Sequence, residues 1–340
     1  MSKMQLKIQG DFKLTAANSK ITAKEYDEAL ALYEQAKDLY ASAVLKEVTV
    51  SDPVDLEDKI KQNLASVYKN WVASLIFKSE VDSSVAADSL LKAIAVSVEG
   101  AGAGYGDAIT GNLHTACHNL GLHYHKSGDF NQAIEFLEKA KAIKNDDMST
   151  SYFLGLCHLA KNDLANAELE FRASVDLAKV DDAALALNSF CKLIKSKIDQ
   201  GEDSKDILEE AFEYLATLEQ ETQMENIESA NMICSHLAQK KLIDGEDIED
   251  INALSKFINA GSDANILVAQ LTDAALYLNS TGEHKNCVKM LLGIQKVAED
   301  KSQIQDYLTS LWLGHHDSEG EAEILGDYGH EYTIDDFNFA

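Results

Sequence analysis

Residues 114–179 repeat one pattern of residue types at a constant interval of 34 positions. The repeated pairs are Leu120 and Leu154, Gly121 and Gly155, Gly128-Asp129 and Asn162-Asp163, Ala133 and Ala167, Leu137 and Phe171, Ala140 and Ser174, and Ile143 and Leu177. Glycine inside an apolar helical stretch costs about 1 kcal/mol relative to alanine, so Gly121 and Gly155 indicate that a second helix crosses close to the backbone there. The pattern therefore predicts stacked helix pairs, each burying its apolar face against the next.

The first copy of the pattern resembles a known repeat family. Residues 119–133 read Asn-Leu-Gly-Leu-His-Tyr-His-Lys-Ser-Gly-Asp-Phe-Asn-Gln-Ala, which is similar to the tetratricopeptide repeat, with Tyr124 in its aromatic position. Asn145 stands where that family usually has proline. The composition agrees with helices, because Pro53 is the one proline of the chain. The resemblance implies an all-α fold, an α-solenoid of tetratricopeptide-like antiparallel helix pairs.

Weaker copies of the pattern and changes in composition divide the rest of the chain. The expected parts are an N-terminal helical repeat region (1–99), a Gly-rich joint (100–106), the best-matching repeats (107–181), divergent helical repeats with a capping helix (182–313) and an acidic aromatic tail (314–340). The joint does not satisfy G-x-G-x-x-G and follows a helical stretch, so a dinucleotide site is disfavoured. We expect a flexible connection there.

The first predicted unit is less regular than the others. Residues 24–46 form an amphipathic helix with Ala29, Tyr33 and Ala36 in the positions of a second repeat helix. A first helix over residues 12–19 would complete the unit, with residues 1–12 as a short arm. The same segment is also similar to the helical hairpins of microtubule-interacting-and-trafficking domains.

The charge of the chain limits its partners. The formal net charge of −27 disfavours nucleic acid and anionic membranes, because phosphate binding needs Lys and Arg. No stretch is long and apolar enough for membrane insertion, and the first residues lack a signal peptide, so a cytoplasmic protein is expected. The five cysteines are scattered without a C-x-x-C pair, so we expect no cofactor or metal on them.

A cluster of histidines is the one candidate for catalytic or metal chemistry. His114 and His118 lie four residues apart, a spacing that can hold zinc on one helix face, and His125 follows two turns later. No acidic residue adjoins His114 as a base, and the sequence places no third ligand. We therefore predict a non-enzyme, with polar residues of a repeat surface as the main interpretation of the cluster. A metal-dependent helical enzyme is the weaker alternative.

The family resemblance also implies a binding surface. Tetratricopeptide arrays bind peptides in a concave groove lined by the first helix of each unit, and we expect that role for ten residues. These are Lys59, Gln62, Lys69, His118, Asn119, Leu122, His125, Lys126, Tyr152 and Leu156. Asn119 alone falls in a position of the clamp with which some family members hold chaperone tails, so that mode is disfavoured. The function expected is a scaffold or adaptor for a protein or peptide; a structural subunit of a larger complex is the alternative.

The end of the chain has its own chemistry. No Lys or Arg follows Lys301, and the tail carries Tyr328, Tyr332, Phe337 and Phe339 among carboxylates. Such a segment cannot build a core, so we expect disorder. Its charge and its aromatic residues complement a groove offering lysines, which makes the tail a candidate autoinhibitory ligand.

Overall fold

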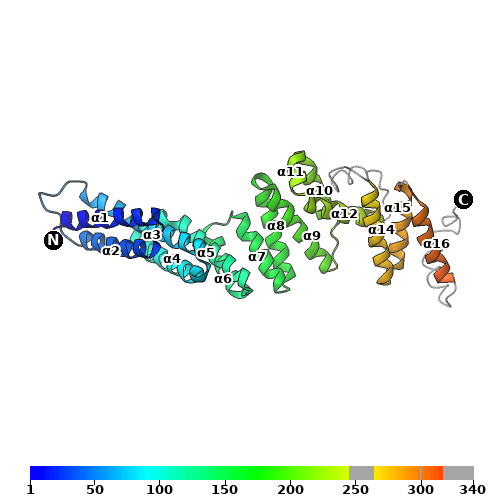
Figure 1. Cartoon of the computed structure of the whole chain (residues 1–340), viewed down its shortest axis with the longest axis horizontal. Helices are drawn as coiled ribbons and strands as arrows, with labels where there is room; N and C mark the ends of the chain where they lie inside the picture. The colour runs from blue at the N-terminus through cyan, green and yellow to red at the C-terminus, as the bar shows by residue number, and fades with distance from the viewer. Residues whose placement is uncertain (245–263, 299, 317–340) are drawn as a thin grey trace. The chain divides into compact units, whose positions relative to one another are not determined.

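The described part of the chain is helical throughout. The structure, a computed structural model, describes residues 1–244, 264–298 and 300–316 (Figure 1). Its α-helices are α1 Lys3–Thr22, α2 Tyr26–Val44, α3 Leu56–Val81, α4 Ala86–Gly100, α5 Gly106–Ser127, α6 Phe130–Ile143, α7 Met148–Ala160, α8 Leu164–Asp181, α9 Ala183–Asp199, α10 Lys205–Thr217, α11 Gln220–Glu225, α12 Ile227–Ile243, α14 Ala264–Ser280, α15 His284–Val297 and α16 Ser302–His316. Those residues contain no strand, and the expected all-α solenoid of helix pairs is confirmed.

The chain forms two compact units. Unit 1 comprises Met1–Leu177 and unit 2 comprises Ala178–Ala340. The finer division into five parts remains a prediction, and the acidic tail lies outside the described residues. None of the described helices is long and apolar enough to cross a membrane.

In unit 1, consecutive helices pack as hairpins, and the first helix of each hairpin also packs on the first helix of the next. The first helices are α1, α3, α5 and α7; their partners are α2, α4, α6 and α8. The small and large positions of the repeat are buried as predicted, with Ala133, Ala167, Leu137 and Phe171 at 0% exposure. A Cβ atom on Gly121 would lie 2.5 Å from Cγ of Leu137, which shows why this crossing requires glycine.

The same device closes the first hairpin, which the sequence placed incorrectly. Helix α1 begins at Lys3, so the predicted arm over residues 1–12 is wrong. The helix starts there because Ser2 and Gln5 form a capping box, in which each side chain accepts from the other's backbone N–H. A Cβ atom on Gly10 would lie 2.8 Å from the Tyr40 ring, so α1 and α2 also approach closely.

The Gly-rich segment between α4 and α5 stays on the helical path. Residues Ala101–Tyr105 form a turn of π-helix, kinked at Gly104, whose φ is 92°. A positive φ favours glycine, because a side chain there would be strained. The sequence predicted an open, flexible connection; the structure instead joins α4 to α5 through this kinked turn.

Unit 2 follows the same principles less regularly. Gly201 follows α9 and Gly282 follows α14, both with positive φ, as expected for glycines that end helices. A Cβ atom on Gly293 in α15 would lie 2.2 Å from a methyl carbon of Leu242 in α12, so these helices cross closely. The predicted helix over residues 248–258 lies outside the described residues, whereas α16 confirms the helix predicted near residues 303–313.

Candidate functional site

Polar side chains join the first helices α1 and α3. The ammonium of Lys3, whose side chain is 1% exposed, lies 2.6 Å from Oε1 of Glu57. Further along, Asn63 donates from Nδ2 to Oδ1 of Asp11 over 2.8 Å, and Tyr40 donates to the same carboxylate oxygen over 2.6 Å. Because buried polar groups need partners, this ladder fixes the register of α1 against α3.

The ladder continues from α3 through α5 to α7. Asn112 donates from Nδ2 to the backbone carbonyl of Lys69 over 3.0 Å, which joins α5 to α3. His118 Nδ1 lies 2.9 Å from Oγ1 of Thr150, which joins α5 to α7. The four first helices of unit 1 therefore form one continuous wall.

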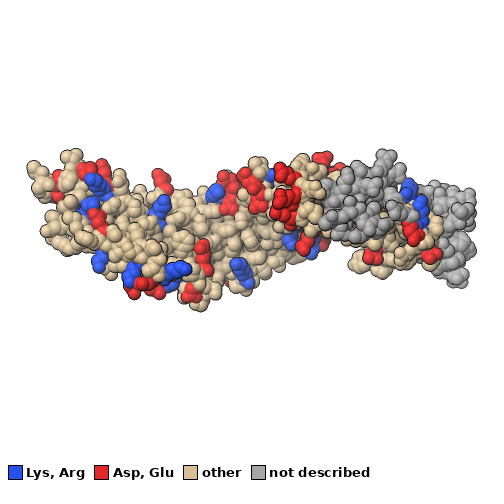
Figure 2. All heavy atoms as spheres, turned by 45° about the horizontal axis from the view of Figure 1, so that its top comes forward, with Lys and Arg blue, Asp and Glu red and all other residues tan. Residues whose placement is uncertain are grey.

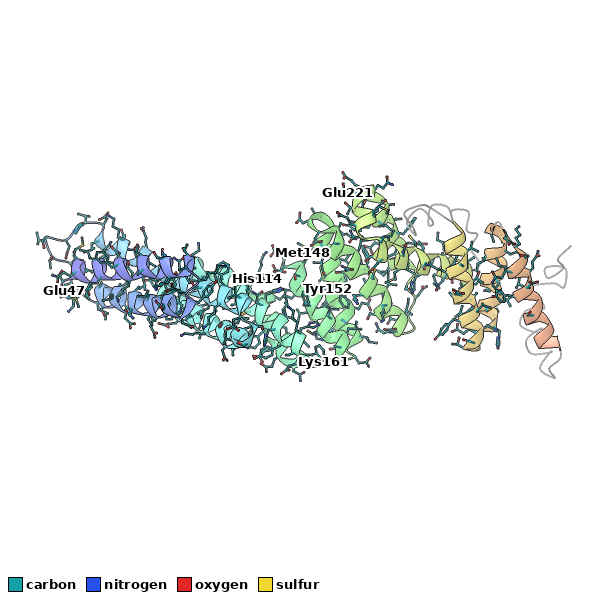
Figure 3. The ribbon with its side chains drawn as sticks, viewed as in Figure 1. Glu47, His114, Met148, Tyr152, Lys161 and Glu221 are labelled. Carbon is teal, nitrogen blue, oxygen red and sulfur yellow. The ribbon has the colours of Figure 1, made fainter. Side chains whose placement is uncertain are left out.

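His114 meets the beginning of α7 (Figure 3). Its Nε2 atom lies 3.1 Å from Oδ2 of Asp147, within ion-pair distance, but the alignment is not that of a hydrogen bond. The other carboxylate oxygen of Asp147 caps α7 by accepting from the backbone N–H of Thr150 over 3.0 Å. The histidine and the cap thus meet where two repeats stack.

The pKa values of two neighbouring histidines are lowered. Burial lowers the pKa of His118, with the charge of His114 acting in the same direction and that of Asp147 opposing it. The pKa of His125 is also lowered, chiefly by burial and also by Lys126. Both effects favour neutral rings, which suits packing against apolar side chains.

These histidines belong to a row of aromatic rings. Phe153 of α7 receives the edges or faces of His118 and His125, with ring centroids 6.3 and 5.6 Å away. Tyr152 contacts Phe153 at 5.6 Å and the buried Phe171 at 5.9 Å. The row packs α5 against α7, so the histidine rings contribute to the repeat interface.

No metal-binding group accompanies the histidines. Across residues 1–244, 264–298 and 300–316, no three His, Cys, Asp or Glu side chains are arranged to hold a metal ion. The thiols of Cys117 and Cys157 are buried, and burial raises the pKa of each to about 11. Thiols with such pKa values are poor nucleophiles at neutral pH.

The ten predicted site residues all lie on first helices of unit 1. Four of them are exposed, namely Lys59, Gln62, Lys69 and Lys126. The other six are half-buried: His118, Asn119, Leu122, His125, Tyr152 and Leu156. Lys59 forms an ion pair of 2.6 Å with Asp55, and Leu122 packs on the buried cluster around Leu137. We name the surface formed by these ten residues the first-helix surface.

Sequence reasoning missed three residues of this region: Asp147, Thr150 and Phe153. The capping position of Asp147, immediately before an apolar helix, was a usable signal for its role at the start of α7. Thr150 and Phe153 gave no comparable signal, because their partners lie on another helix.

Acidic residues are scarce on the first helices. The helices α1, α3, α5 and α7 contain five of the chain's 57 Asp and Glu residues: Asp11, Glu57, Asp58, Glu80 and Asp107. On the face drawn in Figure 2, unit 1 also shows wide areas without charged side chains. A strongly acidic protein therefore keeps most of its negative charge off this wall.

A family model for the tetratricopeptide repeat matches residues 116–148. That match covers most of α5, all of α6 and the start of α7, in the register set by Gly121, Ala133 and Leu137. The chain belongs to the tetratricopeptide repeat superfamily. No curated protein matches the chain in sequence.

Several solved structures of tetratricopeptide repeat proteins are similar in fold. YrrB, described as having an unusual peptide-binding site, is 17% identical, with 60% of this chain and 86% of YrrB covered and a TM-score of 0.34. The C-terminal part of a repeat protein from Cytophaga hutchinsonii is 14% identical, with 73% and 97% covered and a TM-score of 0.41. A human IFIT1 dimer with PPP-AAAA is 15% identical, with 83% and 68% covered and a TM-score of 0.35. Likeness at this level says nothing of what the present chain binds.

Proposed function

We propose that this chain is a non-catalytic scaffold or adaptor that binds a peptide segment of another protein on the first-helix surface of unit 1. The supporting observation is the chemistry of that surface. It combines half-buried apolar and aromatic side chains with exposed lysines, on helices nearly free of acidic residues, in a chain of net charge −27. Such a surface suits a segment with apolar anchors and some negative charge.

Two parts of the surface have different roles in this proposal. Leu122, Tyr152 and Leu156 hold the apolar anchor, because they combine exposed apolar area with support from the buried core. Lys69 and Lys126 are exposed and attract the acidic part of the partner. His118 supports the wall from inside, because its ring is committed to Thr150 and Phe153.

Affinity capture from an extract of the source organism tests the proposal. We expect the double variant Tyr152→Ala with Leu156→Ala to lose most of the proteins that the wild type captures, because it removes the apolar anchor site. Circular dichroism must show wild-type helix content. The matched control is Leu169→Ala, which removes a leucine that is 60% exposed on the second helix α8.

Retention of the same captured proteins by the double variant would place the binding site elsewhere. The competing role, a structural subunit of a larger complex, predicts a different result. In that case the partner would be held by a broad surface, so both the double variant and the Leu169→Ala control would weaken capture only slightly.

We further propose that the acidic tail competes for the same surface. Its sequence supplies Tyr332, Phe337 and Phe339 beside Asp335 and Asp336, which complement Lys69 and Lys126. A tethered segment acts at high effective concentration, so even a weak match is effective.

Deleting residues 317–340 tests the competition. We expect the shortened chain to bind its partner more tightly than the full chain, and high salt to reduce the difference because it screens the ionic contacts. Equal affinity of the two proteins at low and high salt would show that the tail does not compete.

A further inference from the structure

Helix α1 carries an uncovered apolar row that the peptide site does not use. Ile8 is 41% exposed and Phe12, four residues later on the same side of the helix, is 73% exposed. Large apolar side chains this exposed and this close together are typical of an interaction surface. We name Gln5, Ile8, Phe12, Thr15 and Ser19 the α1 row.

The position of α1 explains why the row is open. Each middle first helix of unit 1 has a first helix on both sides, since α3 contacts α1 and α5. Among the described helices, α1 has extensive contacts with α2 and α3 alone. Repeat arrays stack helix pair on helix pair and normally end on a polar face. Phe12 therefore occupies a face that another helix would suit.

The row is also free of charge. Between Gln5 and Ser19, all the exposed side chains of α1 are uncharged; they are Gln5, Ile8, Gln9, Phe12, Thr15, Asn18 and Ser19. Lys7 and Asp11, the nearest charged pair, are 15% and 37% exposed and neutralise each other across 2.6 Å. Lys13 is half-buried.

This lack of charge favours one occupant. Two copies of a chain with net charge −27 repel each other over most of their surfaces. Contact between copies is least opposed where neither presents an acidic side chain, and the α1 row meets that condition. The row is also short and nearly symmetric about its centre, which lies between Ile8 and Phe12.

We propose that the α1 row is the interface of a homodimer. Two α1 helices pack antiparallel about a two-fold axis, so that Phe12 of one copy lies against the partner subunit's Ile8 and the reverse. A two-fold interface uses the same patch twice, which a single uncharged row provides. This proposal does not depend on peptide binding by the first-helix surface.

Sedimentation velocity over a concentration series, with the full-length chain, tests the dimer. We expect the wild type to approach twice the mass of one chain as the concentration rises. Ile8→Lys and Phe12→Lys should both stay at the mass of one chain, because each places a charge in the interface. The matched control is Phe77→Lys, which changes a phenylalanine that is 52% exposed on α3 and should dimerise as the wild type does.

The response to salt separates this interface from an ionic one. Raising the salt concentration should strengthen the dimer, because it screens repulsion between the acidic copies and leaves apolar contact intact. A single-chain mass for the wild type at all concentrations would overturn the proposal. So would dimers of unchanged strength in Phe12→Lys, or a dimer that salt dissociates, which would indicate lysines meeting the acidic tail. Circular dichroism of each variant must show the wild-type helix content.

Discussion

Gly121→Ala is expected to lower the free energy of unfolding of unit 1 by about 1–3 kcal/mol, although alanine is the better helix former. The added Cβ would lie 2.5 Å from Cγ of Leu137 and 3.3 Å from the backbone oxygen of Ala133. The leucine side chain can shift, but a backbone oxygen moves only with its helix. The loss should appear as a lower denaturant midpoint.

The same helix supplies the control. Gly111 is an exposed residue of α5, and a Cβ atom there would meet nothing within 4 Å. Gly111→Ala should therefore raise the free energy of unfolding by about 0.5–1 kcal/mol, since it removes only the flexibility of glycine. If both substitutions changed stability in the same direction, the crossing of α5 and α6 at Gly121 would be wrong.

Phe171→Ala should cost about 3–5 kcal/mol, the largest loss that we expect from one substitution in unit 1. The ring is 0% exposed and packs on Gly155 and Tyr152 where α8 crosses α7. Leu169→Ala, two residues away but 60% exposed, should change stability by about 0.5 kcal/mol or less. Equal losses in the two variants would contradict the placement of α8.

The contact between Gly155 and Phe171 can also be tested by coupling. A Cβ atom on Gly155 would lie 2.7 Å from the Phe171 ring, so Gly155→Ala alone should destabilise. In a Phe171→Leu background the smaller side chain leaves room, so the same substitution should cost less, with an interaction free energy of about 0.5–3 kcal/mol. Additive losses would mean that these residues do not touch.

The repeat register could be predicted from the sequence because its physical causes lie within one helix pair. Gly121 and Leu137 fill complementary positions of a single crossing, and Gly155 and Phe171 repeat the arrangement 34 residues later. Two copies of the same crossing at a fixed interval leave little freedom in how the chain pairs.

The site was only partly predictable, because its decisive contacts join different repeats. His118 was expected to face the ligand, whereas its ring lies against Thr150 and Phe153 of the next unit. Residue spacing along one helix shows which side chains share a face, but not what a neighbouring repeat places against that face. The start of α1 was missed for a similar reason, since the ion pair that anchors Lys3 involves Glu57 of α3.

Site-specific photo-cross-linking tests the central claim, that partners bind on the first helices of unit 1. A photoreactive phenylalanine analogue is placed at Leu156 on α7 in one protein and at Leu169 on α8 in another, and each is irradiated in an extract of the source organism. We predict cross-linked partners from position 156 and none from position 169. Cross-links from position 169 with none from position 156 would contradict the account and place the binding surface on the second helices.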